Sequence, residues 1–167
     1  MTRRALIGVA LSVAGLLVAY QIVATAPARA QDRIAFAKVL WDSLQAKDYR
    51  QWAPLPRHSA DMYPGKSPHG AFLKLYGNRT AVSHSRTLPY GSIIVKENFK
   101  PDKSLAAVTV MYRIKGFDPT HHDWYWVKYM PNGAVAKKGT MQAAGKVGTC
   151  IGCHAQAKGN DWTFSND

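Results

Sequence analysis

Four short runs rich in valine, isoleucine, tyrosine and tryptophan occupy the middle of this chain, and they constrain its fold more than any other feature. Clusters of glycine, proline and asparagine, which are typical of turns, separate them. The runs are Phe72–Tyr76, Ser92–Phe99, Ala107–Lys115 and Trp124–Met130. In the third run, Val108 and Val110 alternate with Thr109 and Met111, which places the two sets on opposite faces of a strand. The pattern predicts a mainly antiparallel β-sheet.

A helix is expected before this sheet. Between Asp32 and Lys47, apolar residues recur at the three- and four-residue spacing that places them on one helical face. The segment from Tyr49 to Gly70 holds four prolines and should be irregular. The predicted fold class is therefore α+β, with an N-terminal helix, a dominant antiparallel sheet and a separate C-terminal segment.

Residues 1–30 have the composition of a secretory signal peptide. Arg3 and Arg4 precede an apolar stretch over residues 5–26, and Ala28-Arg29-Ala30 supplies the small residues of a cleavage site. We expect cleavage after Ala30 and export to the periplasm, which leaves residues 31–167 as a single domain. The apolar stretch is also long enough to span a bilayer, so a retained membrane anchor is the alternative.

The chain is basic, with a formal net charge of +12. Loss of Arg3, Arg4 and Arg29 with the signal would lower this charge to +9. A basic exported protein could attract an acidic redox partner or an anionic ligand by long-range steering. The lysines are scattered along the chain rather than gathered in a long basic run, so we expect no nucleic-acid partner.

The two cysteines of the chain lie together in Cys150-Ile151-Gly152-Cys153-His154. This C-x-x-C-H pattern is typical of covalent c-type haem attachment, in which both thiols bond to the porphyrin and the histidine ligates the iron. A zinc site would need a second ligand pair, and a thioredoxin-like pair is expected near a βαβ unit. A disulfide within the pair would leave His154 unexplained. The motif predicts one haem c per chain, bound at Cys150 and Cys153 with its iron on His154.

The sixth coordination position of the iron is left open. Only 13 residues follow His154, so a second ligand must come from upstream. The candidates are Met62, Met111, Met130, Met141, His58, His69, His84, His121 and His122. None of them stands out, and we expect a predominantly five-coordinate iron. The C-terminal motif also excludes small class I cytochromes, and the strands exclude the four long helices of cytochromes c′.

Four segments together resemble the cytochrome P-460 family, which includes the cytochromes c′-beta. They are Pro68-His69-Gly70-Ala71-Phe72, the stretch Leu88–Glu97 that ends in Val95-Lys96-Glu97, Trp124-Tyr125-Trp126-Val127-Lys128, and the haem motif itself. The resemblance implies a mostly antiparallel β fold, a homodimer and a five-coordinate haem with an open distal face.

Two residues gain a role from this resemblance. In family members that oxidise hydroxylamine, a lysine at the position of Lys96 is bonded to the porphyrin, so Lys96 should face the haem here. Those enzymes also carry a distal carboxylate on the next strand, where this chain has Met111 and no Asp or Glu between Lys103 and Gly116. Met111 would make the distal pocket apolar.

These features divide the functional hypotheses. Lys96 favours an oxidoreductase that acts on hydroxylamine or nitric oxide. The missing carboxylate favours a cytochrome c′-beta-like protein that binds nitric oxide or carbon monoxide without turnover. Simple electron transfer, the third hypothesis, would need a sixth ligand.

The haem motif yields the first testable prediction. Replacing Cys150 and Cys153 together by alanine should abolish covalent haem, because the chain has no other thiol to form a thioether. Haem staining after denaturing electrophoresis measures this directly. A stained band in the double variant would contradict the assignment.

Overall fold

The computed structural model describes residues 31–56, 58–83 and 87–164. By internal contacts the chain divides into a unit at Met1–Arg33 and a unit at Ile34–Asp167. The expected signal peptide lies outside the described residues. Within the described ranges, no helix has both the length and the apolar character needed to cross a membrane.

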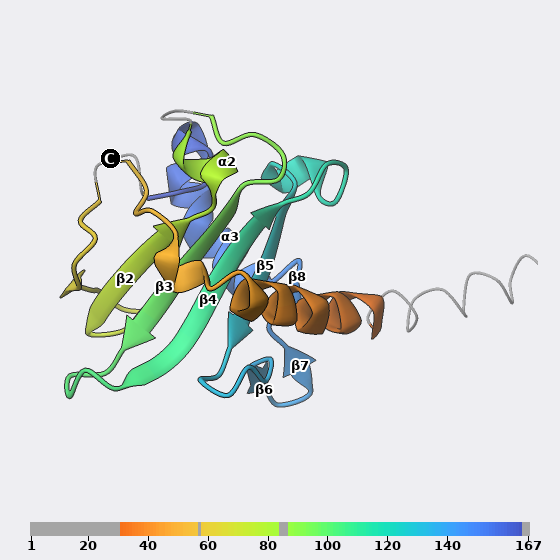
Figure 1. The fold of residues 1–167 in the computed structure, drawn as a ribbon. Helices are drawn as coiled ribbons and strands as arrows, with labels where there is room; N and C mark the ends of the chain where they lie inside the picture. Colours follow the sequence, from red (N-terminus) through yellow and green to blue (C-terminus); the bar gives the residue numbers. More distant parts are fainter. Residues whose placement is uncertain (1–30, 57, 84–86, 165–167) are drawn as a thin grey trace, which may run out of the picture. The chain divides into compact units, whose positions relative to one another are not determined.

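A six-stranded antiparallel sheet forms the second unit (Figure 1). Its strands run in the order β1, β2, β3, β4, β5 and β8. Their bounds are Tyr63–Pro64, Phe72–Gly77, Ile93–Phe99, Leu105–Arg113, Trp124–Tyr129 and Ala144–Gly145. A separate two-stranded ribbon pairs β6 (Lys137–Lys138) with β7 (Met141–Gln142). The α+β class and all four predicted strands are confirmed, with ends that differ by one or two residues.

Helices and short turns complete the fold. The N-terminal helix spans residues 31–46, as its apolar spacing predicts. The α-helices α2 and α3 span Arg79–Val82 and Gly148–His154, and the 3-10 helices η1, η2 and η3 span Tyr49–Gln51, Pro119–His121 and Ala155–Asn160. The proline-rich segment is mostly irregular, as expected, apart from η1 and the two residues of β1.

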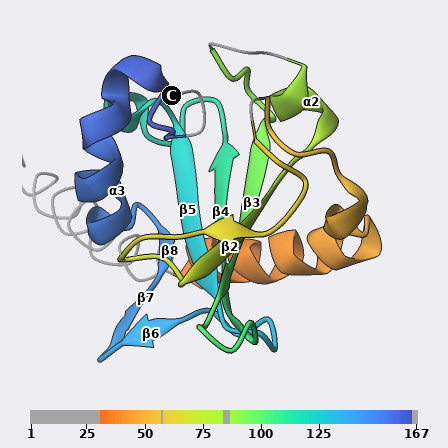
Figure 2. The same cartoon turned by 90° about the vertical axis from the view of Figure 1, so that its left-hand side faces the viewer.

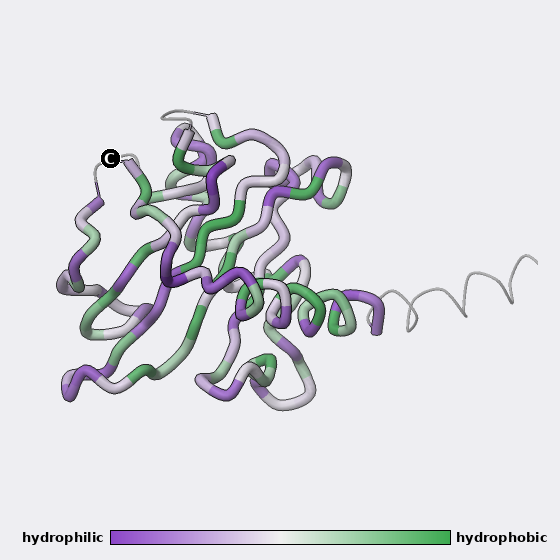
Figure 3. Tube along the Cα trace, in the orientation of Figure 1, coloured by the Kyte–Doolittle hydropathy of each residue, from purple (hydrophilic) through white to green (hydrophobic). Residues whose placement is uncertain are grey.

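The sheet is covered on both faces. In Figure 1 the helical residues 34–46 lie in front of the sheet and α3 lies behind it, and Figure 2 shows α3 beside β5 and β8. The front layer packs Leu40 and Leu44 against Val95, Val108 and Val110. The helix accordingly alternates between hydrophobic and hydrophilic residues along its length (Figure 3).

The rear layer is a second apolar cluster. It joins Ile94, Met111 and Trp126 of the sheet to Trp162 near the C-terminus, and Cys150 of α3 packs against it. Along β4, Val110 faces the front layer and Met111 faces the rear layer, as the alternation in the sequence predicts. Both faces of the strand are buried. The rear layer is the one that contains the haem motif.

A buried carboxylate holds the front layer together. Glu97 is 3% exposed. It accepts hydrogen bonds from the hydroxyls of Tyr49 at 2.8 Å and Tyr76 at 2.9 Å, and Arg50 Nε donates to it at 2.7 Å. Burial, followed by the charge of Glu97, raises the pKa of both tyrosines. These contacts tie η1 and β2 to β3, the strand that carries Lys96.

Replacing Glu97 by glutamine should lower the free energy of unfolding by about 2 kcal/mol, because charged hydrogen bonds to three donors are lost in a buried site. Denaturant unfolding measures the change. Asp42→Asn is the matched control: Asp42 pairs with Lys38 on the exposed surface, and such a pair is worth at most about 1 kcal/mol. Equal effects of the two substitutions would contradict a central role for Glu97.

Candidate functional site

The haem motif lies on α3, which follows the short strand β8 after Lys146 and Val147. Cys150 and Cys153 are three positions apart on this helix, so both thiols project from nearly the same side. Both cysteines are free and half-buried, and burial raises the pKa of the Cys150 thiol. The helix therefore presents two unpaired thiols side by side, as attachment to one porphyrin edge requires.

His154 ends α3 and is held in one tautomer. Its Nδ1 lies 2.7 Å from the backbone oxygen of Trp162. A carbonyl oxygen can only accept, so Nδ1 carries the hydrogen and Nε2 keeps a free lone pair. Burial is the main influence on this ring and lowers the pKa of His154, which favours the neutral form that can ligate iron.

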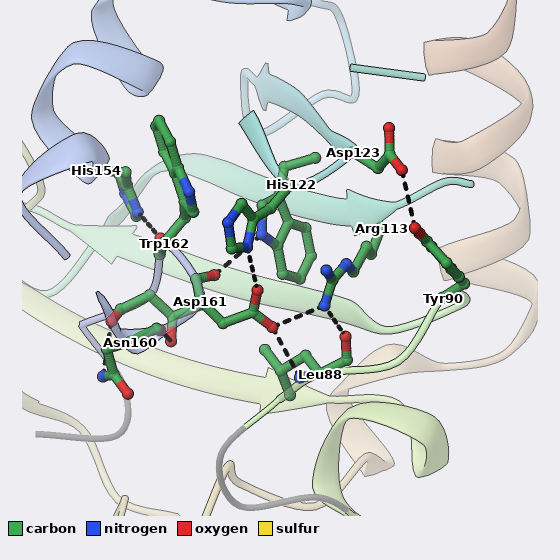
Figure 4. A network of polar contacts seen from close by, with 11 residues as sticks. Leu88, Tyr90, Arg113, His122, Asp123, His154, Asn160, Asp161 and Trp162 are labelled. Atoms are coloured by element: carbon green, nitrogen blue, oxygen red, sulfur yellow. Dashed lines mark hydrogen bonds and ion pairs between the residues drawn. The ribbon is translucent and has the colours of Figure 1, made fainter. Parts of the chain in front are cut away.

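The carbonyl that orients His154 belongs to a fixed turn. Asp161 and Trp162 both have left-handed backbone angles, with φ of 55° and 64°. The buried Asp161 carboxylate accepts from the Leu88 amide at 2.8 Å, pairs with Arg113 at 2.8 Å and contacts His122 Nδ1 at 2.9 Å (Figure 4). Asp161 is not among the residues predicted from the sequence, where its signal is an acidic residue beside a tryptophan, seven positions after His154.

Lys96 faces the same layer as the motif. It alternates with Val95 of the front cluster and shares its strand face with Ile94 of the rear cluster. Burial lowers the pKa of the Lys96 ammonium, and the nearby Cys153 opposes this shift. The charge of Lys96 in turn helps lower the pKa of His154. The structure thus places Lys96 beside the attachment segment.

Met111 is buried in the rear layer, opposite Ile94 and Trp126 in the strand register. The ring of Trp126 lies 4.7 Å from that of His154. Met111 thus shares a row of side chains with Trp126, whose ring contacts His154, whereas Lys96 is one row further along the sheet, opposite Thr109. The role of Met111 in a distal pocket stays a prediction.

The other candidate ligands are dispersed, with one exception. Met130 and Met141 are exposed, His121 and His122 contact the carboxylates of Asp118 and Asp161, and His84 lies outside the described residues. The exception is His69, whose ring centroid is 6.5 Å from that of His154. Burial, followed by the charge of Lys96, lowers the pKa of His69 to about 4.

The residues of this layer fit a haem. Two thiols and a neutral imidazole are the donor set that c-type attachment uses. In addition, the buried indole nitrogens of Trp126 and Trp162 have no hydrogen-bond partner among the residues that the structure describes. Buried donors without partners are costly. The carboxylate side chains of a haem are acceptors of the kind that these donors lack.

A mainly antiparallel sheet with a C-x-x-C-H helix on one face defines a cytochrome built on a β-sheet rather than on a helical bundle. The comparison with known families agrees. The model of the family described as Cytochrome P460 matches residues 46–165. This chain belongs to the cytochrome P460 family, which confirms the resemblance seen in its sequence and implies a haem cytochrome. No curated protein matches the chain significantly.

The Asp161 network should make a measurable contribution to stability. Asp161→Asn keeps the size of the side chain and tolerates the left-handed backbone. It removes the charge that faces the part-buried Arg113, so we expect a loss of about 3 kcal/mol in the free energy of unfolding.

Asp48→Asn is the matched control for that substitution. Asp48 also has a left-handed φ, of 41°, but it is exposed and its side chain caps no helix. Its replacement should change the free energy of unfolding by less than about 0.5 kcal/mol. Thermal unfolding followed by circular dichroism compares the two, and similar values would contradict the proposed anchoring by Asp161.

Proposed function

We propose that this protein is an exported mono-haem c-type cytochrome that acts in the redox chemistry of hydroxylamine or nitric oxide. Its haem is bonded to Cys150 and Cys153 and ligated by His154. The observation that carries the proposal is the position of Lys96, which is half-buried on the rear face of the sheet and close enough to Cys153 for their charges to interact. Haem supplies the electron transfer and the iron site at which a small ligand binds.

The roles of the protein side chains follow from their contacts. The two cysteines hold the porphyrin, and the Trp162 carbonyl supports the donor strength of His154 by accepting its Nδ1 hydrogen. Lys96 in its neutral form would be a nucleophile toward a porphyrin carbon. Formation of that C–N bond removes a hydrogen from the amine and another from the carbon, and their electrons pass to an oxidant such as a peroxide.

A second candidate function is reversible binding of nitric oxide or carbon monoxide, as in a cytochrome c′-beta. It is supported by the absence of Asp and Glu from β4, since oxidation of hydroxylamine needs a group that accepts protons. The family resemblance also supports a homodimer, and the basic charge suits an acidic redox partner. Export to the periplasm rests on the signal-like composition of residues 1–30.

The test uses holoprotein matured with covalent haem. Peptide mapping by mass spectrometry should find Lys96 and Cys150–His154 joined through one haem, and hydroxylamine should reduce an added electron acceptor. Lys96→Met should abolish both. Lys128→Met is the matched control, because Lys128 is paired with Thr109, the strand partner of Lys96, but is exposed.

The competing outcomes are distinct. An unmodified Lys96 without turnover, together with tight binding of nitric oxide or carbon monoxide by the reduced protein, would replace the oxidoreductase by the gas-binding function. Absence of both turnover and ligand binding would reject both functions.

A further inference from the structure

Positive charge is concentrated in the part of the chain that contains the haem motif. From Trp124 to Asn160 there are five lysines and no aspartate or glutamate. One of them, Lys146, pairs with the buried Asp118 at 3.1 Å, and another lies on η3. The other three are exposed and take part in none of the ion pairs among the described residues; they are Lys128, Lys137 and Lys138. This region of the surface therefore carries charge that no described carboxylate offsets.

Two of these lysines form one strand of the β6–β7 ribbon. The ribbon continues directly from the end of β5, because Lys128 bonds to both of its flanks. The Lys128 amide donates to the Ala143 oxygen at 2.9 Å, and the Lys128 oxygen accepts from the Ala136 amide at 2.8 Å. In Figure 2 the ribbon projects beyond β8, on the side of the sheet where α3 lies.

The base of the ribbon is close to the attachment cysteines. Burial raises the pKa of the Cys150 thiol, and the charge of Lys128 opposes this shift, so the two side chains are near enough to interact. Gly148 and Thr149, which precede Cys150, are exposed. A Cβ atom added to Gly148 or to Gly152 would meet no atom of the described residues within 4 Å. The start of α3 is therefore open to solvent beside the ribbon.

An exposed apolar side chain accompanies the two ribbon lysines. Met141 is 69% exposed, and it pairs directly with Lys138 across the ribbon. Methionine is enriched in protein–protein interfaces, where an apolar centre is surrounded by a polar rim. Complementary charges around such a centre accelerate encounter with a partner more than they increase affinity. This combination suits a brief contact with an acidic protein.

We propose that Lys137, Lys138 and Met141, together called the ribbon surface, are the docking site of an acidic protein that carries one electron. The proposal rests on the proposed function, because oxidation of hydroxylamine requires an acceptor for the electrons. One electron passes from the ferrous haem iron, which becomes ferric, to the oxidised centre of the partner, and no bond forms or breaks. A second copy of this chain would bring the same positive charge to the contact, which opposes that occupant.

The test follows oxidation of chemically reduced holoprotein by plastocyanin, an acidic copper protein, in a stopped-flow experiment. At low ionic strength, replacing Lys137 and Lys138 together by glutamine should lower the second-order rate constant at least about fivefold, because the charge that steers the partner is lost. In 1 M salt the difference should largely disappear, since the screening length falls to about 3 Å. Arginine at both positions keeps the charge and should retain the wild-type rate.

A charge-matched control separates the ribbon surface from the net charge of the protein. Lys47 and Lys115 are exposed and lie outside the ribbon, and replacing both by glutamine removes the same charge. This control should lower the rate constant less than about twofold. Met141→Ser should slow the reaction at every salt concentration, because the contact it weakens is apolar.

Three results would overturn the proposal. Equal slowing in the glutamine variant and the control would assign the effect to net charge. Unchanged plastocyanin kinetics, with binding to phosphatidylserine vesicles that only the glutamine variant loses, would identify a membrane contact. Dissociation of a dimer in that variant would assign the ribbon surface to a second copy. Failure of the proposed function would instead appear as absent hydroxylamine turnover with a small-molecule acceptor, and missing covalent haem would reject both proposals.

Discussion

The rear layer of this protein depends on the buried carboxylate of Asp161. One side chain contacts the Leu88 amide ahead of β3, Arg113 at the end of β4 and His122 ahead of β5. These segments are far apart in the sequence, and the carboxylate links them to the turn that follows α3 (Figure 4). Since the same turn presents the Trp162 carbonyl to His154, the orientation of the His154 imidazole depends on an ion pair outside the haem motif.

Strand β3 connects the two layers through adjacent residues that point in opposite directions. Glu97 lies in the front layer, where Tyr49, Tyr76 and Arg50 surround its charge. Lys96 lies in the rear layer, where burial disfavours its charge. The carboxylate thus has three hydrogen-bond donors around it, whereas burial lowers the pKa of the amine beside it. A slip of one residue in this strand would exchange the two and place the carboxylate beside the haem motif.

Local signals in the sequence were sufficient to predict the strands, the N-terminal helix and the haem motif. Two of these signals extend over only a few residues each. They are the alternation of Val108 and Val110 with Met111, and the spacing of Cys150 and His154. The small elements β1, β6, β7 and β8 were not predicted, because strands of two residues carry no periodicity. The Asp161 network was also missed, since its partners come together only when the sheet has formed.

The difference between local signals and contacts formed by the folded sheet also explains why His69 was not singled out in the sequence. In the sequence it was one of nine methionines and histidines considered as a sixth ligand, and only its place in a segment that resembles the family separates it from His58 and His121. Its special position arises from the pairing of β3 with β4, which directs the amide of Asn98 toward His69 by engaging its nitrogen with Ala107 and Thr109. The family resemblance covers the haem motif, the lysine strand and the segment of His69, but the neighbours that orient the His69 imidazole are known only from the fold. In this protein the strand that carries Lys96 also holds His69 in place through Asn98, so both side chains are positioned by one structural element.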